Sequence, residues 1–300
     1  MVAGVSRVLS YDVGGSHISA AVCSEADLSL GPVVKAPLPE EQSAEAFLDV
    51  LTRLAAQAGA MPKTTAGAGF AMPGPFDYAK GISWMKHKIP YLYGVNLRDA
   101  LAGRMGWSGA QVRFLNDAAA YLLGEVGAGA ARGVARVAGF TLGTGIGSGF
   151  AVNGRIVTEG PGVPPGGEIW NVPFEGGIVE DLISTRSIKE GYLERTGKEK
   201  EVAEIAAGAA NDPAAVEVFA EFGRNLGRVV RVKLHDFAPD VIVLGGGIAH
   251  SAQLFLPAAQ QEIKDLALEL RISLLWEKAP LVGAAVAWFA HAEAKKARAG

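Results

Sequence analysis

The residues of this chain best suited to chemistry lie in and beside three glycine-rich turns, each of which follows an apolar run. The turns read Asp-Val-Gly-Gly-Ser at residues 12–16, Leu-Gly-Thr-Gly-Ile-Gly-Ser-Gly at 142–149 and Val-Leu-Gly-Gly-Gly-Ile at 243–248. Glycine lets backbone N–H groups turn toward a ligand, so such turns at strand ends suit phosphates. Any one of them could be a plain tight turn, but three together favour a nucleotide site.

Asp12 precedes the first pair of glycines by two positions. A carboxylate beside a phosphate-binding turn would repel the phosphates unless a cation lies between them. Asp12 is therefore a candidate for holding Mg²⁺ through water. Its alternative role is that of a turn-forming aspartate.

Asn116 and Asp117 follow an apolar strand and precede a helix of small residues. Either side chain could cap that helix. Two successive polar residues at the carboxyl end of a strand, where α/β proteins bind their ligands, also suit a site. Phosphoryl transfer to an alcohol needs a carboxylate that accepts the hydroxyl proton, and we assign this role to Asp117.

A segment dense in glycine and proline, residues 160–177, is predicted to be an irregular loop, and long loops inside compact proteins are usually functional. Its Glu168 and Asn171, together with Glu180, could hydrogen-bond a polyol. Taken alone, carboxylates in loops are more often simply solvated.

The first two glycine-rich turns are each followed by another short apolar strand, which predicts two β-hairpins. In a P-loop or a dinucleotide fingerprint a helix follows instead. Two hairpins of the same design in separate halves of the chain predict two related lobes that hold a phosphate chain between them. This is the plan of the actin-like ATPase fold.

Strands alternate with helices along the rest of the chain, which predicts the α/β class. We expect a small N-terminal lobe of residues 1–113, completed by a final helix at about 281–300, and a large lobe of residues 114–280. Helices are also predicted at residues 213–236, with Val216 facing inward, and at residues 254–270.

The composition excludes several classes of protein. Basic and acidic residues number 28 and 31, so the chain lacks the basic excess of a nucleic-acid-binding protein. It has no apolar run long enough for a membrane span, and we expect no membrane partner. Cys23 is the only cysteine, which excludes an intrachain disulfide and fits a cytoplasmic protein.

These motifs, together with Met-Pro-Gly-Pro at residues 72–75 and Gly-Glu-Ile at 167–169, resemble in order those of the ROK family. That family takes its name from repressors, open reading frames and kinases, and its enzymes are sugar kinases, glucokinase prominent among them. The similarity covers nearly the whole chain. It implies an actin-like, two-lobed α/β kinase with an interlobe cleft, which uses ATP and Mg²⁺ and works as a cytoplasmic homodimer.

The resemblance also implies roles for individual residues. Asp117 matches the family's catalytic base, and positions that bind the sugar are matched by Gly74, Asn116, Glu168 and Glu180. The donor side would comprise two phosphate turns and an adenosine-binding segment, with the residues Asp12, Gly14, Gly15, Ser16, Gly143, Thr144, Gly145, Gly245, Gly246 and Gly247.

The chain departs from the family around the sugar loop. Asn171 stands where the family has a His that serves both zinc and sugar, and the Cys-rich zinc segment is replaced by residues 172–179. Lys-Ile-Pro at 88–90 stands where Asn-Leu-Pro is common. We therefore expect no zinc and a sugar contact from Asn171. We expect the loop to be fixed by apolar packing of Trp170, Pro173, Phe174 and Ile178.

Together these features predict an ATP-dependent kinase for the 6-hydroxyl of a hexose, with glucose as the first candidate. N-acetylmannosamine, N-acetylglucosamine, mannose, fructose and allose stay open as acceptors, and polyphosphate as donor. A repressor of the family would carry a DNA-binding segment before its first hairpin, and we expect none here. A sugar sensor without catalysis is the remaining alternative, against which Asp12 and Asp117 argue.

Overall fold

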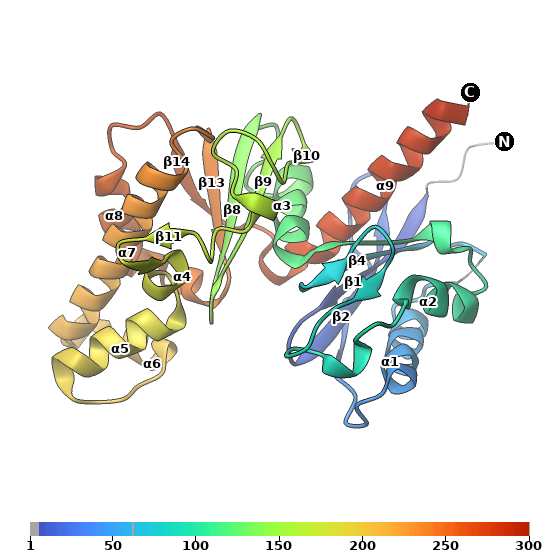
Figure 1. Ribbon diagram of the computed structural model, residues 1–300, viewed down its shortest axis with the longest axis horizontal. Coiled ribbons are helices and arrows are strands. Elements are labelled where there is room, and N and C mark those ends of the chain that lie inside the picture. Colours follow the sequence, from blue (N-terminus) through green and yellow to red (C-terminus); the bar gives the residue numbers. More distant parts are fainter. Residues whose placement is uncertain (1–5, 62, 300) are drawn as a thin grey trace. The chain divides into compact units, whose positions relative to one another are not determined.

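The computed structural model describes residues 6–61 and 63–299, which divide into two compact units (Figure 1). Unit 1 is Met1–Gly129 with Glu277–Gly300, and unit 2 is Ala130–Trp276. The boundary expected near residue 113 falls inside strand β7 (Val112–Asn116). Because β7 is hydrogen-bonded to β4 (Ala68–Met72), the chain leaves unit 1 only after helix α3 (Asp117–Ala128).

Unit 1 contains a five-stranded sheet in the order β3-β2-β1-β4-β7. Strands β1 (Arg7–Val13) and β2 (His17–Ser24) form the first predicted hairpin, and β3 (Val34–Pro37) continues it antiparallel at the edge. Strand β4 pairs parallel with both β1 and β7. The three parallel strands therefore end at the same edge of the sheet.

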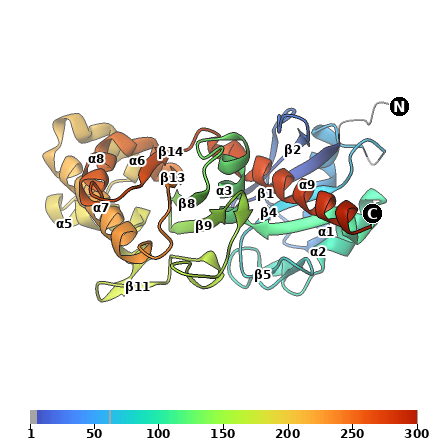
Figure 2. The same cartoon turned by 90° about the horizontal axis from the view of Figure 1, so that it is seen from above.

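Helices cover both faces of this sheet (Figures 1 and 2). Leu9 and Tyr11 of β1 belong to the core beneath α1 (Ala44–Gln57) and α2 (Leu97–Met105). Val8 packs on the opposite face against Trp288 and Phe289 of the closing helix α9 (Ala279–Ala299). Because both faces are covered, β1 is buried at nearly every position rather than at every second one.

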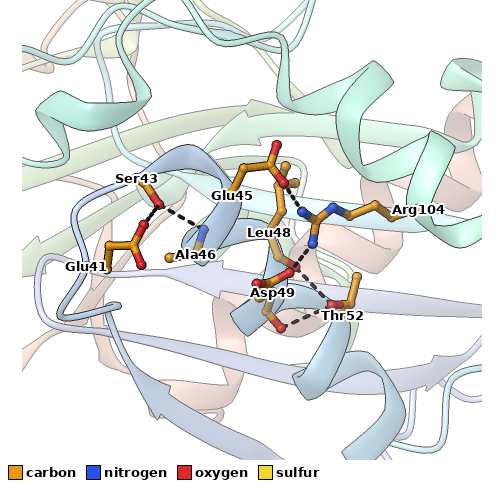
Figure 3. Close-up of polar contacts among 8 residues, drawn as sticks. All are labelled: Glu41, Ser43, Glu45, Ala46, Leu48, Asp49, Thr52 and Arg104. Atoms are coloured by element: carbon orange, nitrogen blue, oxygen red, sulfur yellow. Dashed lines mark hydrogen bonds and ion pairs between the residues drawn. The ribbon is translucent and has the colours of Figure 1, made fainter.

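Ion pairs join α1 to α2 at the surface. Arg104 of α2 contacts the carboxylates of Glu45 and Asp49 on α1, and Ser43 caps α1 by accepting the Ala46 N–H at 3.1 Å (Figure 3). Surface pairs of this kind contribute at most about 1 kcal/mol each. The helices are therefore held mainly by their buried apolar faces.

Unit 2 contains a second five-stranded sheet, in the order β10-β9-β8-β13-β14. β8 (Arg136–Leu142) and β9 (Ile146–Val152) form the second predicted hairpin, extended by β10 (Arg155–Ile156). β13 (Val241–Gly245) pairs parallel with β8 and with β14 (Glu269–Ile272). The two sheets share the sequence of one antiparallel hairpin followed by parallel strands.

Helix α7 (Pro213–Lys233) and helix α8 (Ala252–Glu262) pack together on this second sheet (Figure 1). Val216 of α7 is 46% exposed, so its predicted inward direction is wrong. The helix predicted to continue to residue 270 ends at Glu262, because the residues after it leave the helix and pair as edge strand β14.

The shorter elements occupy the connections. In unit 1 they are β5 (Phe76–Asp77) and β6 (Ile82–Ser83), and in unit 2 they are β11 (Pro173–Phe174), β12 (Gly177–Ile178), α4 (Val179–Leu182), α5 (Thr185–Thr196) and α6 (Val202–Gly208). No helix in the described part of the chain is long and apolar enough to cross a bilayer.

Candidate functional site

The carboxyl ends of β1, β4 and β7 gather the predicted acceptor residues of unit 1. The strand register aligns Asp12 with Ala71 on β4, and aligns Ala71 in turn with Leu115 on β7. Asn116 and Asp117 follow Leu115 directly, and Gly74 follows the end of β4. Parallel strands thus carry these polar residues to one edge, which is where open α/β sheets bind ligands.

Asp12 is a carboxyl group at this edge whose pKa is strongly shifted. Burial raises its pKa to about 7, with a further upward contribution from the carboxylate of Asp117. Lys35 opposes this shift and Glu277 adds to it. Within the described residues, the Asp12 side chain has no hydrogen-bond partner. A carboxylate in this state fits a hydrated Mg²⁺, which is usually held by one or two protein carboxylates and several waters.

Asn116, and not Asp117, provides the main cap of helix α3. The Asn116 Oδ1 accepts the N–H groups of Ala118 at 2.9 Å and of Ala119 at 3.1 Å. Asp117 is the first residue of the helix, and its carboxylate also accepts the adjacent Ala118 N–H at 2.9 Å. Helix capping therefore accounts for Asn116. Asp117 places its carboxylate at the N-terminus of the helix, which is the positive end of the helix dipole.

The first glycine-rich turn connects β1 to β2. The hairpin closes with the Gly14 N–H donating to the His17 carbonyl at 2.9 Å, and both Gly15 and Ser16 are exposed. An added Cβ on Gly15 would meet no atom within 4 Å. Backbone N–H groups in such a turn can approach phosphate oxygens without obstruction.

In unit 2, the carboxylate of Glu180 braces the second glycine-rich turn. It accepts the Ile146 N–H at 3.2 Å and lies 2.0 Å from where a Cβ on Gly145 would be. The turn is closed by the Gly143 N–H, which donates to the Gly145 carbonyl, while Thr144 at its tip is exposed. Glu180 was expected to contact sugar, and its observed contact is with this turn.

The third glycine-rich segment lies against the second turn. Gly246 has a φ of +83°, and a Cβ there would lie 2.4 Å from the Leu142 carbonyl oxygen at the end of β8. Gly245 ends β13, and Gly247 begins the short helical turn Gly247–Ser251. The structure therefore brings together the predicted phosphate and adenosine segments of unit 2.

A pocket of about 500 Å³ opens beside Thr144. Thr185, Lys189 and Leu193 of helix α5 line it together with Lys200. Its size is in the range of small-ligand sites, and it combines apolar and charged groups. Sequence reasoning missed it, since only the folding of α5 against the turn assembles it.

The predicted sugar loop is held mainly by hydrogen bonds. The buried Ser148 hydroxyl donates to the Gly167 carbonyl at 2.6 Å and accepts the Ile169 N–H at 2.9 Å, which fixes the backbone on either side of Glu168. The Trp170 indole donates to the Glu168 carboxylate at 3.1 Å. Asn171 is exposed.

The expected apolar packing of this loop holds only in part. Phe174 is buried in the core of unit 2, and Ile178 is half-buried, but Trp170 and Pro173 are exposed. An ion pair between Glu175 and Arg228 of α7 adds to the buried Phe174 in holding the hairpin β11–β12. Among the described residues no group of three or more His, Cys, Asp or Glu side chains could hold a metal ion.

Tyr78 and Ser148 are site-positioning residues that sequence reasoning missed. The Tyr78 hydroxyl accepts from the Asn116 amide at 3.3 Å and donates to the Met72 carbonyl at 3.1 Å, so it joins the ends of β4 and β7. Ser148 lies within the second glycine-rich turn motif, which was the available signal. Nothing in the sequence around Tyr78 predicts that it positions Asn116.

Comparison with known proteins agrees with this description. A model of the ROK family matches residues 8–289. A glucokinase of Thermotoga maritima is 28% identical over 93% of this chain and 96% of its own length. An N-acetyl-D-glucosamine kinase of Shigella boydii is 24% identical over 85% of this chain and 87% of its own length.

Among solved structures, the ROK hexokinase of Thermus thermophilus superposes with a TM-score of 0.80 at 26% identity, over 96% of this chain and 99% of that one. This likeness confirms the predicted α/β, actin-like fold. Sugar kinases of known structure share it at full length, so both sheets and the helices that cover them belong to the common architecture.

Proposed function

We propose, because this chain belongs to the ROK family, that it is a sugar kinase that transfers the γ-phosphoryl group of ATP to the 6-hydroxyl of a hexose, with glucose as the first acceptor. The observation that carries the proposal is the row formed by Asp12, Asn116 and Asp117 at the ends of parallel strands. The raised pKa of Asp12, caused by burial and by Asp117, supports a shared role for the two carboxylates.

In the proposed reaction, the carboxylate of Asp117 accepts the proton of the acceptor hydroxyl as its oxygen attacks the γ-phosphorus. One P–O bond forms to the sugar, and the bond to the bridging oxygen of ADP breaks. Asp117 later releases the proton to solvent. Asn116 orients a neighbouring sugar hydroxyl, while Tyr78 fixes the Asn116 amide.

Asp12 would hold hydrated Mg²⁺, which when bound neutralises charge on the phosphates of ATP. The turns at Gly14–Ser16 and Gly143–Gly145 would donate backbone N–H groups to those phosphates. We assign the nucleoside to the pocket beside Thr144 and to the adjoining Gly245–Gly247 segment. The size of that pocket and its contact with the second turn support this assignment.

For the sugar, Glu168 and Asn171 are the proposed contacts of unit 2, and Gly74 is that of unit 1. Glu168 is positioned by Trp170 and by the Ser148 bridge. Glu180 is proposed to act through the second turn as well as on the sugar, because its carboxylate contacts the Ile146 N–H. We further propose a cytoplasmic homodimer, as the resemblance implies.

An N-acetylhexosamine is the second candidate acceptor, since several relatives at 24–27% identity are N-acetyl-D-glucosamine kinases. An assay of sugar phosphate formation with a panel of sugars decides between them. Each sugar is offered with ATP and, separately, with polyphosphate, and ADP is also measured where ATP is the donor. Sugar phosphate formation that depends on Mg²⁺ supports a kinase, whereas sugar binding without sugar phosphate from either donor in the whole panel would indicate a sensor.

A further inference from the structure

A second pocket, of about 520 Å³, lies in unit 1 beside the Gly74–Pro75 turn. The loop between β6 and the short turn Pro90–Leu92 also lines it. Gly74 is a proposed sugar contact, but no residue of the loop has a role in the phosphoryl transfer described above. The contribution of the loop therefore needs its own explanation.

The loop that forms this wall is well anchored. Met85, Ile89 and Leu92 are almost completely buried in the core of unit 1. The Trp84 N–H donates to the Pro75 carbonyl at 3.0 Å, which ties the loop to the Gly74–Pro75 turn. With its apolar side chains inside, the loop presents its remaining side chains outward in fixed positions.

Two of the outward side chains are large aromatic rings. Trp84 is 43% exposed and Tyr93 is 49% exposed, and their ring centroids lie 5.5 Å apart at an angle of 71°. Two exposed rings lose the stabilisation that burial of aromatic side chains usually provides. Aromatic faces are electron-rich, so they attract the polarised C–H groups on the flat face of a sugar ring.

The other outward side chains are two lysines and a histidine. Lys86 lies over the Tyr93 ring at 5.5 Å, and His87 and Lys88 are exposed in the same pocket. No ion pair joins Lys86, His87 or Lys88 to a carboxylate among the described residues. Asp77, the one acidic residue in the segment 73–95, pairs with Lys80 instead. The pocket thus carries positive charge that the protein does not neutralise.

Hydrogen bonds connect this pocket to the acceptor end of the site. The Asn116 amide donates to the Tyr78 hydroxyl, and that hydroxyl donates to the Met72 carbonyl. Gly74, which lines the pocket, follows Met72 by two residues. A sugar that presents a hydroxyl near Asn116 can therefore extend toward the cationic loop.

We infer that the acceptor preferred by this protein is an anionic sugar, a hexose or N-acetylhexosamine that carries a carboxylate or sulfate. Its ring contacts Trp84 or Tyr93, and its charged group is bound by Lys86 and Lys88. This inference rests on the proposed function for the hydroxyl that is phosphorylated. The charge preference itself is a property of the pocket and is measured by binding alone.

The test uses three sugars that differ only at one substituent: N-acetylmuramic acid, its methyl ester and N-acetylglucosamine. Binding to the full-length protein is measured by titration calorimetry without nucleotide. We expect the acid to bind about tenfold more tightly than the ester, a difference of about 1.4 kcal/mol. In the double variant Lys86→Gln/Lys88→Gln this ratio should fall to near one, whereas Lys80→Gln, whose lysine lies outside the pocket, should keep it.

Equal binding of acid and ester, or a preference that survives the double variant, would overturn the inference. ADP formation with the same sugars and ATP separates the two proposals. If neutral sugars are phosphorylated and the acid is not preferred, the proposed kinase activity is supported and the proposed anionic acceptor is contradicted. Lysine-dependent binding of the acid, combined with no ADP from any sugar, would confirm the pocket and contradict the kinase.

Discussion

At the scale of single residues, Asp117 is the group whose loss should stop the reaction. We expect Asp117→Asn to lower kcat by about 10²–10⁴ while the sugar still binds, because a positioned base contributes on this order. Folding should be unaffected, since Asn116 provides the main cap of α3. Steady-state kinetics and sugar titration measure the two effects.

The matched control for this variant is Asp99→Asn. Asp99 likewise lies in the first turn of a helix, α2, and is exposed on the surface of unit 1. Its replacement should leave kcat within twofold of the parent. If Asp117→Asn retains a kcat within a few-fold of the parent, Asp117 is not the base.

The raised pKa of Asp12 predicts how the stability of the protein depends on pH. An unfolded aspartate ionises near its ordinary pKa of 3.8, but the folded one ionises near 7, so the fold loses stability as pH rises between these values. In Mg²⁺-free buffer, Asp12→Asn should raise Tm only slightly at pH 4 and markedly at pH 8. The free-energy gain at pH 8 is on the order of 4 kcal/mol at most.

Replacing Lys35 should change Tm at pH 8 in the opposite direction. Its charge lowers the pKa of Asp12, so Lys35→Met should make ionised Asp12 more costly and reduce Tm at pH 8 more than at pH 4. Lys80→Met, which removes a lysine on the surface of the same unit, is the control. A Tm advantage of Asp12→Asn that does not grow with pH would contradict the assigned electrostatics.

Glu180 makes contacts that predict which substrate its removal affects. Its carboxylate accepts the Ile146 N–H in the second glycine-rich turn, so Glu180→Ala should loosen that turn and raise the KM for ATP several-fold. Glu194→Ala, on the exposed side of α5, is the control. A rise in the sugar KM with an unchanged ATP KM would show that Glu180 acts on the sugar alone.

At the scale of elements, the site depends on where strands end. β1, β4 and β7 run parallel and finish at the same edge, so Asp12 and Asn116 lie at one edge of the sheet although they are far apart in the chain. In unit 2 the equivalent strands are β8 and β13, and their ends bring Leu142 against Gly246. Each unit thus places its predicted site residues where a hairpin strand and a parallel strand end side by side.

The junction after β13 predicts a sharp difference between two adjacent glycines. Gly246→Ala would place a Cβ at positive φ and 2.4 Å from the Leu142 carbonyl oxygen, so it should destabilise the protein by about 2 kcal/mol or more. Gly247→Ala meets no atom within 4 Å and should change stability by about 0.5 kcal/mol or less. Chemical denaturation measures both, and equal effects would contradict the close approach of the two segments.

At the scale of the whole molecule, the sequence was sufficient for the class of fold and for the main motifs. Both hairpins and the long helix α7 are confirmed, because strand and helical apolar patterns are local signals. The division of the chain is not local. Strand β7 looks like the start of a new unit in sequence, but it completes the first sheet by pairing with β4.

The parts that sequence reasoning missed depend on tertiary contacts. The helix predicted to reach residue 270 overlaps the start of strand β14, which is a strand only because it pairs with β13. Trp170 is expected to fix the sugar loop by apolar packing, but it is exposed and its indole donates to the Glu168 carboxylate. The contact of Glu180 with Ile146 joins segments 34 residues apart and has no sequence signature.

The metal requirement of the whole protein is the last prediction. A structural zinc site needs four ligands, mainly Cys and His, with tetrahedral geometry. In the segment where relatives of this chain are expected to bind zinc, the carboxylates already have protein partners: Glu175 pairs with Arg228, Asp181 with Arg186, and Glu180 accepts the Ile146 N–H. We therefore expect Mg²⁺ alone to sustain activity.

Elemental analysis of protein purified from zinc-supplemented medium should find no stoichiometric zinc, and prolonged chelation followed by Mg²⁺ should restore full activity. Chelation should also leave Tm unchanged.

Arg228→Ala, which removes the ion pair that holds the β11–β12 hairpin, should lower Tm by about 1–2 °C, since a half-exposed pair contributes about 0.5–1 kcal/mol. Arg224→Ala removes an ion pair to Glu217 on the same helix, and should leave the kinetics for sugar unchanged. Activity that zinc restores and Mg²⁺ does not would mean that a metal, and not this ion pair, organises the loop.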